Sequence, residues 1–200
     1  DVIDMNRYPL PQIEAMTLAN RKVGLGVMGF ADLLVRMGVA YDSPQAEQLA
    51  ERVMKLVQEA AVEASRQLAA ERGAFPNFAA SRYGVRGETP RRNATVTTIA
   101  PTGSISIVAG ASSGIEPLFA LAFKRRVLDG AELFEINPPF EEVAREEGFY
   151  SDELVATIAK TGTLHDVDGV PERWRELFQT AHDVTPWGHI RIQAAFQRHT

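Results

Sequence analysis

The chain has 200 residues, with 21 Lys and Arg against 26 Asp and Glu, so its formal net charge is −5. A mildly acidic chain lacks the basic surface used for sequence-independent DNA binding, and we expect no nucleic acid polymer as partner. The absence of cysteine excludes disulfides, thiolate metal sites and a thiol nucleophile from these residues. No apolar run approaches the roughly 20 residues of a membrane span, and the charged start, with Asp1 and Asp4, is unlike a signal peptide. We therefore expect a cytoplasmic protein without a membrane partner.

The first half of the chain predicts helices joined by glycine-rich segments. In chain order we expect an extended lead-in at 1–10, helices at 11–20, 30–37 and 44–72, and a loop at 74–92. Ser43 can cap the longest helix and Gly73 can end it. Apolar residues recur along that helix at spacings of three and four, which predicts one buried stripe of Leu49, Val53, Leu56, Val57, Ala60, Ala64 and Leu68.

The second half mixes strands and helices. We expect strands at 94–100 and 105–109 around a tight turn at 101–104, a strand pair at 121–128 and 132–136, and helices at 138–147, 151–160, 171–180 and 186–199. Asp129-Gly130 is a hairpin-turn signal between the paired strands. Without a repeat or linker, residues 1–200 are predicted to form a single domain of α/β layer or barrel architecture.

The segment Gly24-Leu25-Gly26-Val27-Met28-Gly29 matches the dinucleotide-binding fingerprint literally. That fingerprint needs a buried apolar strand directly before it, whereas polar Asn20, Arg21 and Lys22 precede a single Val23. We favour a close-packed strand-to-helix turn, in which glycine permits close backbone approach. A dinucleotide-dependent oxidoreductase is the alternative, and it predicts binding of a nicotinamide cofactor.

A second motif offers hydroxyl groups beside backbone N–H groups in a turn. Its residues are Pro101, Thr102, Gly103, Ser104, Ile105 and Ser106. Such a nest suits phosphate oxygens, although the absence of Lys shows that it is not a Walker loop. The residues alone favour an anion site and a hydroxyl-rich structural turn equally. Residues 109–114 add a second stretch of small side chains, which allow a backbone or ligand to come close.

Other polar groups are interpreted as ordinary surface. Residues 91–93 and the basic run 124–126 are expected to be solvated charge. The histidines lack metal-ligand spacing, so no metal site is predicted from His165, His182, His189 and His199. The acidic pairs at 141–142 and 146–147 are expected to serve solubility.

Five segments together carry a family resemblance that extends over most of the chain. They are residues 20–34, 72–78, 92–106, 112–117 and 186–197. With them, the chain resembles the large catalytic subunit of ribonucleotide reductases, and most closely the adenosylcobalamin-dependent class II enzymes.

The resemblance implies the C-terminal part of a ten-stranded α/β barrel, incomplete in this chain. It implies reduction of ribonucleoside diphosphates to 2′-deoxyribonucleotides by a cysteine thiyl radical, with adenosylcobalamin as cofactor of the complete enzyme. The implied partners are the remaining part of the reductase chain, a thioredoxin-type reductant and a second copy in a homodimer. Binding of the substrate phosphates is implied for Pro101, Thr102, Gly103, Ser104, Ile105 and Ser106.

The sequence departs from the family in lacking every cysteine that the chemistry needs. We therefore expect an inactive piece when isolated, with no catalytic residue among these 200. Two alternatives stay open. One is a class I large subunit that works with a metal-containing small subunit, and the other is a non-catalytic fragment or interaction module that needs a complementary chain.

Overall fold

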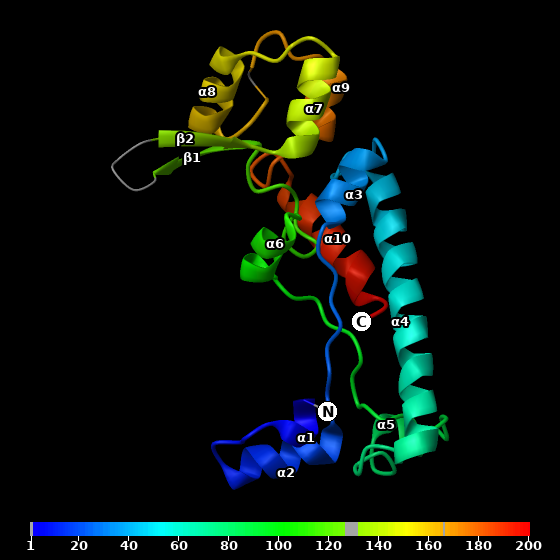
Figure 1. The fold of residues 1–200 in the computed structure, drawn as a ribbon. Helices are drawn as coiled ribbons and strands as arrows, with labels where there is room; N and C mark the ends of the chain where they lie inside the picture. Colours follow the sequence, from blue (N-terminus) through cyan, green and yellow to red (C-terminus); the bar gives the residue numbers. More distant parts are fainter. Residues whose placement is uncertain (1, 127–131, 166) are drawn as a thin grey trace. The chain divides into compact units, whose positions relative to one another are not determined.

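The structure is a computed structural model that describes residues 2–126, 132–165 and 167–200 (Figure 1). Its helices are α1 (Val2–Met5), α2 (Pro11–Asn20), α3 (Phe30–Arg36), α4 (Pro44–Arg72), α5 (Arg82–Val85), α6 (Gly103–Ala109), α7 (Pro138–Glu146), α8 (Asp152–Thr161), α9 (Glu172–Leu177) and α10 (Pro186–Gln197). Its strands are β1 (Ala122–Arg126) and β2 (Glu132–Ile136). No helix within the described residues is both long and apolar enough to cross a membrane.

Two compact units divide the chain. Unit 1 contains the described part of 1–26 with 52–99 and 199–200, and unit 2 contains 27–51 and 100–198. Helix α4 supplies residues to both units because the division falls within it. The single domain predicted from sequence stays a prediction.

In unit 1, the glycine motif pairs with the segment predicted as the strand 94–100. The N–H of Leu25 donates to the Val96 carbonyl at 2.9 Å, and the N–H of Thr98 donates to the Leu25 carbonyl at 3.0 Å. A Cβ atom at Gly24 would lie 2.9 Å from the Thr98 side chain, so only glycine fits. This confirms the close-packed turn, but the predicted strand is reduced to one parallel bridge between Leu25 and Thr97.

Arg91 contradicts the prediction of solvated loop charge. Its side chain is only 7% exposed and donates to Glu88 at 2.9 Å. The guanidinium also lies 3.7 Å from the centre of the Tyr83 ring, a cation–π contact. Asn93 is buried too, and it donates to the Arg21 carbonyl at 2.8 Å. These polar groups are buried because each has a partner, which sequence periodicity does not reveal.

The core of unit 2 lies between the β1–β2 hairpin and helices α7, α8 and α9. Phe140 and Phe178 are fully buried and meet edge to face at 5.2 Å. The strands are antiparallel, with Ala122 opposite Ile136, which confirms the predicted pair. Its predicted turn at Asp129-Gly130 and the side chains of the 124–126 run lie outside the described residues.

The Asp42 carboxylate accepts hydrogen bonds from residues at the start of α10 and in its second turn. It accepts from the Thr185 hydroxyl at 2.7 Å and from Arg191 at 2.5 Å. Thr185 in turn caps α10 by accepting from the N–H of Gly188 at 3.0 Å. Burial raises the pKa of Asp42, but the bonds from Thr185 and Arg191 outweigh it and hold that pKa below its ordinary value.

Four sequence predictions need correction besides those already described for residues 91–93 and 94–100. Residues 2–5 form α1 within the lead-in predicted as extended. Residues 82–85 form α5, capped by Ser81, within the predicted loop. Residues 105–109 lie in α6 and not in a strand, because the Ser106 N–H donates to the Thr102 carbonyl at 2.9 Å and starts a helical turn. Local hydrogen bonding therefore overrides the strand preference of β-branched side chains.

The fourth correction concerns α4, whose boundaries match the prediction while its buried face does not. Leu56 is 69% exposed and Leu68 is 40% exposed, and Ala60 and Ala64 are exposed too. The residues of α4 that are buried are Ala46, Ala50, Met54, Ser65 and Ala69. Small side chains let a neighbouring backbone come close, so the face with alanine and serine is buried in place of the leucine face.

Candidate functional site

The hydroxyl motif forms the start of α6 in unit 2. Thr102 precedes the helix with φ 55° and ψ 23°, a left-handed conformation that is unusual for a residue other than glycine. The Thr102 side chain makes no capping hydrogen bond to the helix. The first N–H groups of a helix have no partner within it. The N–H groups of Gly103, Ser104 and Ile105 thus stand at an exposed helix start without a side-chain cap.

The side chains of this motif differ in what they can offer. Ser104 is exposed and is the second residue of α6. Ser106 is only 1% exposed, and its hydroxyl bonds to the Gly103 carbonyl at 3.3 Å and to the Ser113 hydroxyl at 3.1 Å. The Thr102 hydroxyl accepts from the N–H of Gly114 at 2.7 Å. Ser104 is therefore the hydroxyl most open to a ligand, while Thr102 and Ser106 bond within the protein.

The second small-residue stretch supports the first. Ser113 bonds to Ser106 and Gly114 bonds to Thr102. The stretch 109–114 is therefore held against the 101–106 motif by two hydrogen bonds. Gly114 has φ +50°, and a Cβ there would lie 2.6 Å from the Ala100 carbonyl oxygen. Only glycine permits this approach, which explains the small residues that sequence analysis noted at 109–114.

A third segment, at the start of α3, holds Ser112. The Gly29 N–H donates to the Ser112 carbonyl at 2.8 Å. The Ser112 N–H donates to the Asp32 carboxylate at 2.6 Å, and the Ser112 hydroxyl accepts from the Asp32 N–H at 3.3 Å. Sequence analysis missed Asp32 as part of this arrangement. The signal available was an acidic residue three positions after the last glycine of the motif, where it can reach a neighbouring loop.

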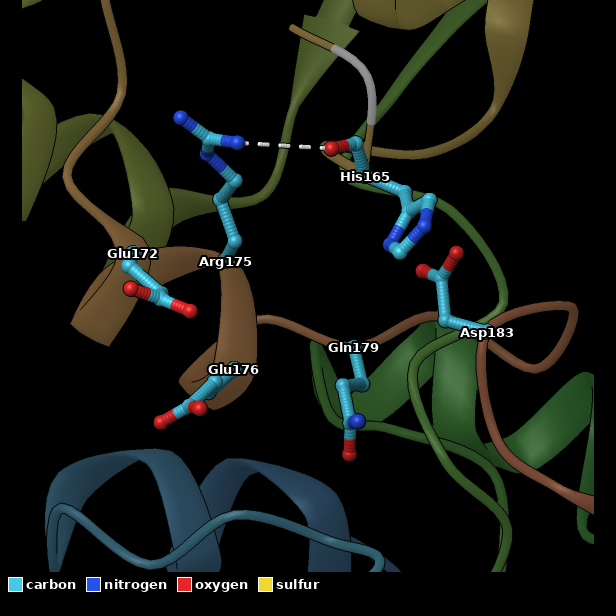
Figure 2. A pocket seen from close by; sticks show the side chains of 6 residues that line it. All are labelled: His165, Glu172, Arg175, Glu176, Gln179 and Asp183. Carbon is cyan, nitrogen blue, oxygen red and sulfur yellow. Dashed lines mark hydrogen bonds between the residues drawn. The ribbon is translucent and has the colours of Figure 1, made fainter.

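Figure 2 shows a pocket elsewhere in unit 2, with a volume of about 300 Å³. It is lined by His165, Glu172, Arg175, Glu176, Gln179 and Asp183. Its groups already serve the fold: Asp183 accepts from the Thr180 N–H at 2.8 Å, and Arg175 donates to the His165 carbonyl at 3.5 Å. No cluster of three metal-ligating side chains occurs within the ranges that the structure describes. None of the lining residues was predicted from sequence.

These observations define a mainly helical fold with one strand pair among the described residues, in which backbone N–H groups and a serine lie at an exposed helix start. Such donors suit an anionic ligand. The sequence pattern of the family "Ribonucleotide reductase, barrel domain" matches residues 1–89 and 85–200. The chain therefore belongs to the ribonucleotide reductase barrel domain family.

Similar proteins agree with this family. The chain is 52% identical, over its whole length, to 28% of the "Vitamin B12-dependent ribonucleoside-diphosphate reductase" of Mycobacterium tuberculosis. It is 50% identical to 26% of the protein of that name from Thermoplasma acidophilum. The chain thus spans about a quarter of the length of these curated relatives.

A solved structure confirms the expected fold family. The class Id ribonucleotide reductase alpha subunit of Actinobacillus ureae matches 98% of this chain and 35% of its own, with a TM-score of 0.77 and 26% identity. Strand pairing among the described residues of this chain consists of the β1–β2 pair and two isolated parallel bridges, so the barrel is not complete in them. The prediction of an incomplete α/β barrel is confirmed.

The expected cobalamin cofactor does not fit a site formed by the described residues alone. Pockets for drug-sized ligands measure roughly 300–1,000 Å³, and cobalamin is larger than such ligands. The pocket in Figure 2 is at the lower end of that range, and Arg175 and Asp183 on its rim already bond within the protein.

Proposed function

We propose that this chain is part of the catalytic subunit of a vitamin B12-dependent ribonucleoside-diphosphate reductase. Identities of 52% and 50% to proteins with that name support this assignment. Relatives named only as ribonucleoside-diphosphate reductases are less similar, such as the large subunit of Caenorhabditis elegans at 28%. The substrate would be a ribonucleoside diphosphate, which a dithiol reduces to the 2′-deoxynucleotide, with water and a disulfide as the other products.

The complete enzyme must supply the thiols, because this chain has no cysteine. In the proposed enzyme, a cysteine outside these residues would carry the radical, and the chemistry that adenosylcobalamin would supply when bound is the generation of that radical. A thioredoxin-type protein would regenerate the reducing thiols, and the cytoplasm provides the reducing conditions for that exchange. The role of the residues described here is to bind and orient the substrate. A homodimer is part of the same proposal.

The phosphate-binding role falls on residues 101–106. The observation that carries it is the bond between the Thr102 hydroxyl and the Gly114 N–H. Because Thr102 bonds away from the helix, the N–H groups of Gly103, Ser104 and Ile105 stay uncapped and can donate to phosphate oxygens. Pro101 shapes the turn, and the Ser104 hydroxyl adds a donor on the exposed side. Ser106 is proposed to support this loop from its buried position.

Ser104→Ala in the full-length reductase tests this role. A hydrogen bond to a charged group contributes about 1.5–3 kcal/mol, so the substrate KM should rise roughly 10- to 100-fold. Thr89→Ala is the matched control, because Thr89 is an exposed hydroxyl in unit 1 far along the chain from the loop. A KM equal to that of the control variant would remove Ser104 from the phosphate site.

Cofactor dependence tests the class of enzyme separately. We expect dNDP formation by the full-length protein to require added adenosylcobalamin and a dithiol. Activity that requires a metal-containing second subunit, without cobalamin, would assign the chain to the class I alternative. A full-length chain that binds nucleoside diphosphate and reduces none under either condition would favour the non-catalytic alternative.

A further inference from the structure

Three successive residues, Ser112, Ser113 and Gly114, bond to two different segments, the 101–106 loop and the start of α3. Ser113 and Gly114 bond to Ser106 and Thr102 of the phosphate loop. Ser112 faces the other way and bonds to the start of α3, where its N–H donates to the Asp32 carboxylate at 2.6 Å. Residues 112–114 therefore connect the 101–106 loop to α3, the helix that follows the glycine motif. The proposed reaction gives that glycine motif no role.

Ser112 is held at every polar backbone and side-chain atom. Its carbonyl accepts from the Gly29 N–H, its N–H donates to Asp32, and its hydroxyl accepts from the Asp32 N–H. Gly29 can take part because its φ of +79° turns its N–H toward Ser112 at the start of α3. Three bonds to one residue fix both its position and its orientation. Gly114 follows two residues later and is thereby placed to donate to Thr102.

Thr102 needs such support because its backbone is in the left-handed region, with φ 55°. That conformation costs a β-branched residue free energy and persists only when the surroundings hold it. The Gly114 N–H on the Thr102 hydroxyl is the bond that holds it, and it also keeps that hydroxyl from capping α6. Free N–H groups at the helix start thus depend on a chain of contacts that begins at Asp32.

We infer that Asp32 is a positioning residue that sets the affinity for the substrate diphosphate through Ser112, Gly114 and Thr102, without touching the substrate. The inference rests on the proposed phosphate-binding role of residues 101–106. On this inference, the Gly29–Asp32 segment serves to hold Ser112 in place and not to bind a dinucleotide. It also gives different roles to Thr102, whose hydroxyl bonds to the Gly114 N–H, and to Ser104, which is exposed.

The test compares Asp32→Ala with Asp32→Asn in the full-length reductase. Alanine removes the acceptor for the Ser112 N–H, whereas the amide oxygen of asparagine keeps it. For alanine we expect about a 10-fold rise in the KM for nucleoside diphosphate, with kcat changed less, and a matching rise in the Ki of inorganic pyrophosphate. Asparagine should restore both values. If both variants change equally, the charge of Asp32 acts and the inference is overturned.

A second pair of variants, at Thr102, tests the same chain of contacts. Thr102→Val removes the acceptor for the Gly114 N–H and Thr102→Ser keeps it, so only valine should weaken pyrophosphate inhibition. Because Asp32 and Thr102 act in one chain of contacts, Asp32→Ala combined with Thr102→Val should weaken it little more than either alone. Fully additive effects would overturn the inference. If Asp32→Ala does not fold, the Thr102 pair decides, and unchanged inhibition in Thr102→Val overturns it.

The control is Asp168→Ala, which removes an exposed acidic side chain elsewhere in unit 2 and should leave KM and Ki unchanged. The outcome for Ser104→Ala separates this inference from the proposed function. If Ser104→Ala raises KM while Asp32→Ala does not, the loop binds phosphate and only the positioning role fails. If neither raises KM, the phosphate-binding role itself fails.

Discussion

Gly114→Ala should destabilise the 101–106 loop by more than the cost of the left-handed backbone alone. Alanine at φ +50° pays the left-handed penalty of about 1–2 kcal/mol. Its Cβ would also lie 2.6 Å from the Ala100 carbonyl oxygen, a backbone atom that cannot rotate away. Overpacking of this kind costs about 1–3 kcal/mol. Together the two costs should lower the free energy of local opening by about 2–5 kcal/mol.

Hydrogen exchange of the full-length protein, read by mass spectrometry over residues 100–116, measures that opening. A loss of about 2–5 kcal/mol should speed exchange there by about 30-fold to several thousandfold. Gly162→Ala is the matched control, because Gly162 has φ +78° with no atom within 4 Å of the added Cβ. It should speed exchange near residue 162 by only about 5- to 30-fold. Equal effects of the two substitutions would refute the steric part of the reasoning.

Two further predictions concern buried polar contacts. Because its neighbours hold the pKa of Asp42 below the ordinary 3.8, this carboxylate stabilises the fold above that pH and loses its effect as pH falls toward the lowered pKa. The thermal midpoint of the full-length protein should thus exceed that of Asp42→Asn most at pH 6, and the gap should shrink below pH 4; a gap independent of pH would contradict this. Arg91→Lys keeps a charge near Glu88 but loses the planar contact with Tyr83, so we expect about 0.5–2 kcal/mol of destabilisation in urea unfolding. An unchanged midpoint would show that the ring contact contributes nothing.

Helices with strong local signals could be predicted from the sequence. The bounds 44–72 match α4, and Ser43 caps it by accepting from the Ala46 N–H at 3.2 Å. Capping residues also mark the starts of α7 and α8, where Asn137 and Ser151 accept from backbone N–H groups as their residue types suggest. These features depend on residues close in sequence, so a local pattern contains the information.

Features that depend on distant residues could not be predicted. At the start of α6, the Thr102 hydroxyl accepts from the N–H of Gly114, twelve residues further on, and no local pattern contains that contact. The buried face of α4 follows the elements that pack on it, and the periodicity of its leucines does not contain their identity. Arg91 is buried because Tyr83 and Glu88 are folded around it.

The candidate site shows the same division. Residues 101–106 could be selected from sequence because hydroxyls, glycine and proline gather there. The roles within that set could not be predicted, since Ser106 bonds to Ser113 and Thr102 bonds to Gly114, whereas Ser104 is exposed. These phosphate-binding roles stay predictions until the Ser104 variant is measured.

The bonds between Asp32 and Ser112 join residues 80 positions apart in the chain. Closing a loop of about 80 residues costs roughly 4 kcal/mol of chain entropy by the logarithmic scaling, a cost that must be met before the contact exists. We therefore expect the contact that supports the 101–106 loop to form late, after residue 112 has returned to the start of α3. A nascent or partly folded chain would carry every residue proposed to bind phosphate and still lack the Asp32–Ser112 bonds, so on this proposal nucleotide binding would begin only once those bonds have formed.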